Sequence, residues 1–91
     1  MIISNSPDLF GKIFSKTVNV GSVYEIGTNI GRNLDSIKLL KENISCNGVE
    51  INKDASDIAI SKGHGVENNS IFETNESRKF DFVLQAAFLY I

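Results

Sequence analysis

The segment from Tyr24 to Lys38, YEIGTNIGRNLDSIK, has two glycines and an arginine where a strand-like pattern gives way to a helix-like one. A glycine turn before a helix N-terminus presents backbone N–H groups and the positive end of a helix dipole, which suits an anion. A small phosphorylated ligand such as a nucleotide would fit this chemistry. The residues predicted to bind it are Gly27, Thr28, Asn29, Gly31 and Arg32.

The turn matches neither of two common phosphate-binding motifs. A P-loop requires Lys and then Ser or Thr after its last glycine, whereas this chain has Arg32 and Asn33. The dinucleotide fingerprint G-x-G-x-x-G requires a spacing that Gly27 and Gly31 lack. Asp35 also brings negative charge to the expected helix start. A plain strand-to-helix connection, in which the glycines serve turn geometry, stays open as the alternative.

His64 is the single histidine and lies between two glycines, Gly63 and Gly65. It is a candidate ligand contact, or a general base working with Cys46 or a carboxylate. The alternative is an exposed hairpin tip, which the turn-forming neighbours favour. Cys46 is expected to follow a helix, where the dipole opposes a thiolate. We expect no metal and no cofactor, since one His and one Cys cannot complete a metal cage.

Length and charge restrict the class of protein. A chain of 91 residues predicts a single compact domain over residues 1–91. The formal net charge is -2 and the charges are scattered, so nucleic-acid binding is unlikely. No apolar run is long enough to cross a membrane. A single cysteine allows no internal disulfide, which favours a reducing, cytoplasmic location.

The hydrophobic pattern predicts an α+β fold. We expect a small antiparallel sheet of about four to six strands, with one or two helices on one face. The helices are expected from Pro7 to Ser15 and from Leu34 to Ser45, the second ending at a glycine C-cap, Gly48. Strands are expected at residues 1–4 and 17–26, in a hairpin of 49–51 with 57–61, and at 70–74.

The C-terminal segment, residues 79–91, is strongly apolar and fits a strand or a helix. As a strand, which its aromatic content favours, it is apolar on both faces. A covering subunit or a covering helix of the same chain would each explain the second face. The residues expected at an oligomer interface are Val83, Ala87, Leu89 and Ile91.

Three functions follow from these observations. The first is a small non-enzymatic binding protein, such as an inhibitor, an adaptor or an assembly component, including those that phages encode. It would have a protein partner and act as a homo-oligomer. The lack of a catalytic set of residues favours a non-enzymatic role, and the surplus apolar surface of the C-terminal segment favours an oligomer. The second is a binder of a small phosphorylated ligand at the Gly27–Arg32 turn. The third is a small enzyme that uses His64.

Overall fold

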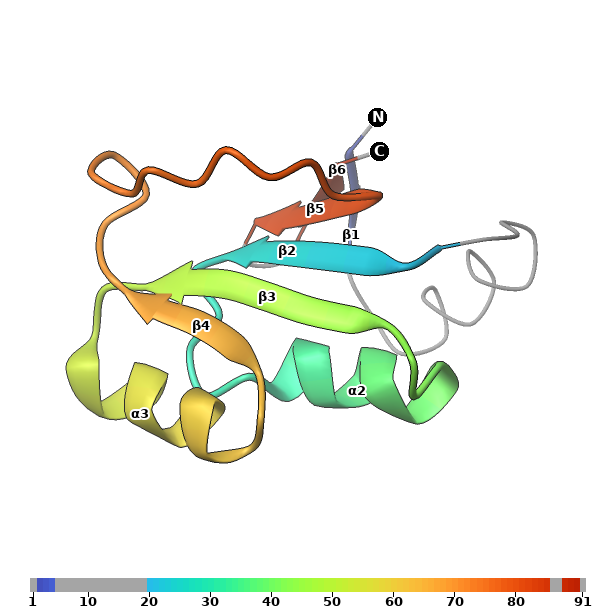
Figure 1. The fold of residues 1–91 in the computed structure, drawn as a ribbon, viewed down its shortest axis with the longest axis horizontal. Helices are drawn as coiled ribbons and strands as arrows, with labels where there is room; N and C mark the ends of the chain where they lie inside the picture. The colour runs from blue at the N-terminus through green and yellow to red at the C-terminus, as the bar shows by residue number, and fades with distance from the viewer. Residues whose placement is uncertain (1, 5–19, 86–87, 91) are drawn as a thin grey trace.

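The computed structural model describes residues 2–4, 20–85 and 88–90. These residues form one six-stranded sheet, and two helices cover one of its faces (Figure 1). The elements in chain order are β1 (Ile2–Ser4), β2 (Ser22–Ile26), α2 (Arg32–Leu40), β3 (Ser45–Glu50), α3 (Lys53–Ser61), β4 (Gly65–Asn68), β5 (Phe82–Gln85) and β6 (Phe88–Tyr90). The helix expected from Pro7 to Ser15 lies outside the described residues.

The sheet has the strand order β1-β6-β5-β2-β3-β4. β5, β2, β3 and β4 run parallel, while β6 and β1 are antiparallel additions at one edge. The predicted antiparallel sheet is therefore wrong. The reason is that β2-α2-β3 and β3-α3-β4 are both crossover units, in which a helix carries the chain back so that the next strand runs parallel.

Helix α3 replaces the hairpin expected between residues 49 and 61. It begins because the side chain of Asn52 accepts a hydrogen bond from the Ala55 backbone N–H at 2.9 Å, an N-terminal cap. Lys53 and Asp57 add an ion pair of 2.7 Å at helical spacing. The capping asparagine was the sequence signal that the strand interpretation overlooked.

The buried side of α3 is made of small residues. Ser56 and Ala59 are fully buried, whereas Ile58 and Ile60 are 44% and 46% exposed. The two isoleucines alternate in sequence as strand residues do, which is why a hairpin was predicted. The helix instead packs closely on the sheet through its smallest side chains.

Helix α2 is shorter than predicted, since Ser45 already begins β3. Gly48 is not a helix cap but a strand residue. A Cβ atom there would collide with the Cγ2 atom of Thr28 and the carbonyl oxygen of Glu25. This glycine therefore marks a close approach between β3 and the turn that follows β2.

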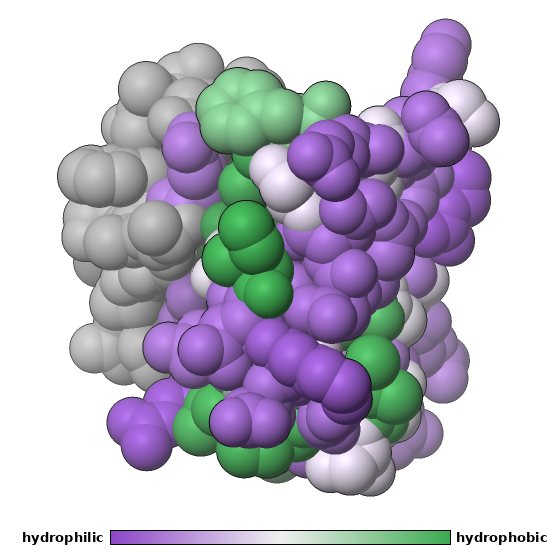
Figure 2. All heavy atoms as spheres, turned by 90° about the vertical axis from the view of Figure 1, so that its left-hand side faces the viewer, coloured by the Kyte–Doolittle hydropathy of each residue, from purple (hydrophilic) through white to green (hydrophobic). Residues whose placement is uncertain are grey.

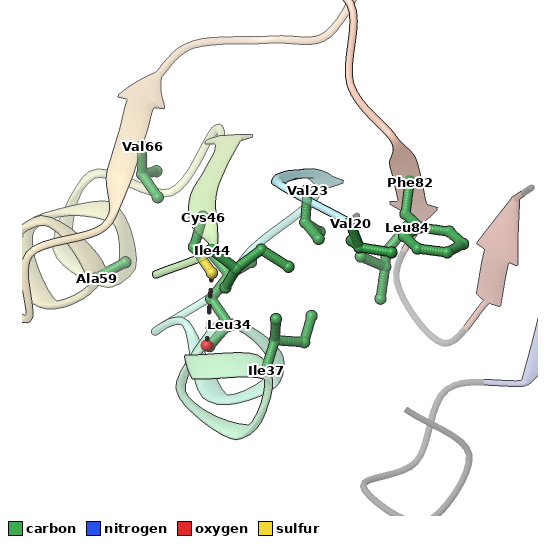
Figure 3. Packing of buried hydrophobic residues seen from close by; sticks show 10 residues of the cluster. All are labelled: Val20, Val23, Leu34, Ile37, Ile44, Cys46, Ala59, Val66, Phe82 and Leu84. Carbon is green, nitrogen blue, oxygen red and sulfur yellow. Dashed lines mark hydrogen bonds between the residues drawn. The ribbon is translucent and has the colours of Figure 1, made fainter. Parts of the chain in front are cut away.

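The core lies between the helices and the sheet (Figure 3). Its ten buried members are Val20, Val23, Leu34, Ile37, Ile44, Cys46, Ala59, Val66, Phe82 and Leu84. The Cys46 Sγ atom lies 3.8 Å from the Leu34 carbonyl oxygen, and burial raises the pKa of this thiol to about 11. Cys46 is therefore a protonated core residue, unsuited to act as a nucleophile with His64.

An irregular segment, residues 69–81, crosses the face of the sheet opposite the helices, and we call it the strap (Figure 1). The Phe80 ring packs on Tyr24 of β2, with 4.9 Å between ring centroids. Arg78 lies over the Phe80 ring at 5.2 Å and donates a hydrogen bond of 3.4 Å to Asn47 of β3. The strand expected at residues 70–74 is part of this strap, and residues 71–73 form a turn instead.

The C-terminal segment forms two short strands rather than one. β5 lies between β2 and β6, and Leu84 within it is fully buried. Val83, expected at an oligomer interface, is half-buried. Leu89 pairs with Leu84 through the β5–β6 ladder, whereas Ala87 and Ile91 lie outside the described residues.

Candidate ligand-binding site

The carboxyl ends of β2, β3 and β4 meet at one edge of the sheet, the edge that faces the viewer in Figure 2. β3 lies on one side of β2 and β5 on the other, so the strand order reverses there. In open parallel sheets, ligands bind at this kind of switch point. A pocket of about 490 Å³ lies there, lined by Gly27, Thr28, Asn29, Ile30, Arg32 and Asn33. We call it the loop pocket.

The loop pocket contains four of the five residues predicted to bind a ligand, and these remain a prediction in that role. Gly27 and Gly31 have φ angles of 78° and 89°, in the left-handed region that glycine adopts without strain. The backbone N–H groups of Gly27 and Thr28 both donate to the Val49 carbonyl, at 2.8 and 3.2 Å. Thr28 is buried, and its hydroxyl donates to the Asn29 carbonyl at 3.2 Å. The turn is thus held to β3 by its own backbone.

Glu50, the last residue of β3, ties the glycine turn to the start of α3. Its Oε1 atom accepts a hydrogen bond from the Asn29 backbone N–H at 2.6 Å. Its Oε2 atom accepts one from the Asn52 backbone N–H at 2.8 Å. A carboxylate has about four lone-pair positions, so Glu50 can accept further hydrogen bonds from a ligand.

Glu25, near the end of β2, is the most unusual group of the site. Its side chain is 1% exposed, and its Oε2 atom accepts a hydrogen bond of 2.7 Å from Asn33 Nδ2. Its Oε1 atom is buried and has no hydrogen-bond partner among the described residues. Burial raises the pKa of Glu25 to about 7; the Asn33 hydrogen bond lowers it, and the nearby charge of Glu50 raises it further. A buried unpaired carboxylate oxygen is unfavourable, and an ammonium donor would satisfy it.

Neither Glu25 nor Glu50 was identified from the sequence. Glu25 alternates with Tyr24 and Ile26, so the strand pattern places it on the polar face of β2, and α2 covers that face. Glu50 follows the glycine turn by about 20 residues, the separation at which an acidic residue contacts ribose hydroxyls in dinucleotide-binding folds. That spacing was the available signal.

His64 is 6% exposed, so the interpretation as an exposed hairpin tip is wrong. Its Nε2 atom lies 2.7 Å from Asp35 Oδ1, and Lys62 Nζ lies 2.8 Å from Asp35 Oδ2. Although burial opposes ionisation of Asp35, the hydrogen bonds from Lys62 and His64 hold its pKa below the ordinary value. The negative charge that seemed to oppose an anion at the start of α2 is therefore paired.

A second pocket of about 240 Å³ adjoins the first, and Gly27 lines both. We call it the apolar pocket. It lies between the ends of β2 and β3 and the start of the strap, and its apolar lining residues are Ile26, Val49, Ile51, Ile71 and Phe72. Figure 2 shows a narrow apolar strip between polar side chains on this side of the molecule.

A metal site and a membrane-spanning helix are both absent from the described residues. Within them, no three His, Cys, Asp or Glu side chains lie together so as to hold a metal ion. No helix of residues 20–85 is long and apolar enough to span a membrane.

No protein-family model and no curated protein matches this chain. Solved structures do match. One is the plantazolicin methyltransferase BpumL in complex with a triazolic desmethylPZN analog and SAH, with a TM-score of 0.67 and 19% identity over 85% of this chain. Others are DesVI of Streptomyces venezuelae (TM-score 0.68, 16% identity, 88% of this chain) and the sugar N-methyltransferase KedS8 from Streptoalloteichus sp ATCC 53650 (0.62, 18%, 92%).

The chain has the fold of part of a methyltransferase. It spans 30% of BpumL, 34% of DesVI and 40% of KedS8. This finding overturns the prediction of a non-enzymatic inhibitor, adaptor or assembly component, because BpumL and KedS8 are enzymes. Nothing in the comparisons supports a phage protein, a protein partner or a homo-oligomer. A small ligand does agree with them, since BpumL holds SAH.

Proposed function

We propose that this chain binds S-adenosylmethionine and its product S-adenosylhomocysteine (SAH), and that it forms the methyl-donor-binding part of a methyltransferase. The observation that carries the proposal is the buried Oε1 atom of Glu25, which has no hydrogen-bond partner among the described residues. The other oxygen of this carboxylate accepts from Asn33, which lines the loop pocket. An α-amino acid ligand supplies the ammonium group that this oxygen lacks.

The loop pocket fits the amino acid end of such a ligand. Glu25 accepts from the ammonium group, and Asn33, which already donates to Glu25, lines the same pocket. The ligand carboxylate faces the first turn of α2, whose N-cap is Gly31 and has no side-chain cap. The backbone N–H groups of this turn and the positive end of the helix dipole favour an anion there, and the exposed Arg32 adds a charged donor. The predicted anion site thus receives a carboxylate in place of a phosphate.

The rest of the edge fits a nucleoside. Glu50 retains lone pairs for ribose hydroxyls, and the apolar pocket beyond it fits the planar base. When bound, S-adenosylmethionine supplies an electrophilic methyl group on its sulfonium. The residues of this chain hold and orient the ligand, and none of them is assigned to the methyl acceptor. One compact domain over residues 1–91 and a cytoplasmic location remain predictions.

Isothermal titration calorimetry of the chain with SAH tests the proposal. We expect Glu25→Gln and Arg32→Ala to weaken SAH binding about tenfold or more, since each removes a charge-assisted hydrogen bond. Glu42→Gln is the matched control, because Glu42 is exposed in the turn after α2, away from the glycine turn. The proposal fails if the unaltered chain does not bind SAH, or if Glu25→Gln binds it as tightly as Glu42→Gln does.

A further inference from the structure

The apolar pocket has an exposed wall made by the first residues of the strap. Phe72 is 95% exposed and Ile51, across the pocket mouth, is 74% exposed. Large apolar side chains are normal on a surface when scattered, but these two line one concave site. The site is also continuous with the loop pocket through Gly27. A ligand that spans both pockets would cover both side chains.

The polar side chains of this wall form hydrogen bonds with neighbouring residues of the same segment. Asn69 donates from Nδ2 to Glu67 Oε2 at 2.7 Å, and its Oδ1 accepts from the Ser70 backbone N–H at 2.8 Å. The Ser70 hydroxyl oxygen accepts from the Phe72 backbone N–H at 3.1 Å. These bonds shape the turn that presents Phe72. The other polar side chain that lines the pocket, Glu50, is assigned to the ribose. The apolar lining is therefore left to recognise an occupant by its flat faces rather than by its hydrogen-bonding edge.

We infer that Phe72 stacks on one face of the purine ring of the bound ligand. We also infer that the pocket makes no selective hydrogen bond to the edge of that ring. The inference rests on the proposed function, which supplies the ligand. Phe72 suits this role because its exposed ring is free to turn onto a flat partner. Base–aromatic stacking tolerates any base, because every base has a π-face.

Binding measurements with three ligands test this inference: SAH, S-inosylhomocysteine, which has an oxygen in place of the adenine amino group, and S-ribosylhomocysteine, which lacks the base. We expect Phe72→Ala to bind SAH about tenfold more weakly, as the loss of one stacked base implies. Phe72→Trp restores the affinity. Phe72→Ala leaves S-ribosylhomocysteine binding unchanged, and the unaltered chain binds the inosyl ligand within about threefold of SAH.

Ile60→Ala is the matched control, because Ile60 is a half-exposed apolar residue of α3 that does not line the pocket. If the unaltered chain binds SAH and Phe72→Ala binds it equally well, the inference is overturned while the proposed function stands. Rejection of the inosyl ligand by about a hundredfold or more would instead show that a polar group reads the base edge, and would also overturn it. If the unaltered chain binds no SAH, the proposed function itself fails.

Discussion

The imidazole Nε2 atom of His64 lies 2.7 Å from the Oδ1 atom of Asp35, although 29 positions separate the two residues. Asp35 is in the first turn of α2, and His64 follows α3. The contact therefore holds the start of α2 against the β3-α3-β4 unit. The same imidazole packs against Gly31, the second glycine of the turn between β2 and α2.

Gly31→Ala is expected to destabilise the chain more than Gly63→Ala does. Both glycines have positive φ angles, 89° and 93°, so an alanine at either costs about 1–2 kcal/mol in backbone strain. At Gly31 the new Cβ would also lie 2.9 Å from His64 Cδ2, whereas at Gly63 it would meet no atom within 4 Å. Urea unfolding should show an extra loss of about 1–3 kcal/mol for Gly31→Ala. Equal losses would mean that the His64 contact is not close.

Glu25→Gln is expected to stabilise the chain at alkaline pH. The folded state raises the pKa of Glu25 from 4.5 to about 7, so folding favours the protonated carboxyl. The unfolding free energy of the unaltered chain should thus fall as the pH rises from 4.5 to about 7, and stay level above that.

The glutamine variant lacks this titration and should show no such fall. At about pH 8 it should exceed the unaltered chain by about 1–3 kcal/mol, since each pKa unit corresponds to 1.36 kcal/mol. The measurement is urea unfolding across this pH range, with Glu42→Gln as the control. A glutamine variant that keeps the same pH dependence would show that Glu25 is not the group responsible. A buried group that lowers stability is typical of a functional site, in agreement with the role proposed for Glu25.

Much of the site's frame could be predicted from the sequence, because local signals agree there. Alternating residues before Gly27 indicated β2, and the spacing of Leu34, Ile37 and Leu40 indicated α2. The glycine turn between them was predicted on these grounds, with a ligand site as one of its two interpretations. The carboxylates of Glu25 and Glu50 were not predicted as part of the site, because their roles depend on which face of each strand is covered.

The sheet direction could not be predicted because it depends on α3. That helix buries Ser56 and Ala59 and exposes Ile58 and Ile60, the reverse of what hydrophobicity suggests. Without α3 the chain appears to return through a hairpin, and a hairpin implies antiparallel strands. Gly48 added to the error, since a glycine needed for close strand approach resembles a helix cap.

Asp35→Asn is expected to cost less than about 1 kcal/mol at neutral pH, because the Asp35 side chain is 40% exposed and solvent screens its ion pairs. The folded state lowers the pKa of Asp35. Its contribution is therefore present above the unfolded pKa, about 3.9, and is lost as the pH falls through the lower folded value. Urea unfolding should show that the difference between the two proteins shrinks below about pH 4. If the stability difference between the two proteins grew as the pH fell, it would contradict the expectation that Asp35 stabilises the fold only when it is ionised.

Phe80→Ala is expected to loosen the strap. The substitution removes the Tyr24 ring contact at 4.9 Å and the Arg78 contact at 5.2 Å, which together contribute about 1–3 kcal/mol. Phe72→Ala is the control on the same segment, and its exposed ring should contribute less than about 0.5 kcal/mol. Unfolding free energies in urea compare the two. Similar losses for both would show that the Phe80 contacts do not hold the strap.

The strap is fastened at both ends rather than along a regular ladder. The Asn69 backbone N–H donates to the Glu50 carbonyl at one end, and Asp81 accepts from Gly21 and Ser22 at the other. Extra residues inserted between these anchors would leave the register of the parallel strands untouched. Evolution can therefore lengthen or shorten one rim of the molecule, at the carboxyl ends of the strands, while the scaffold beneath stays the same.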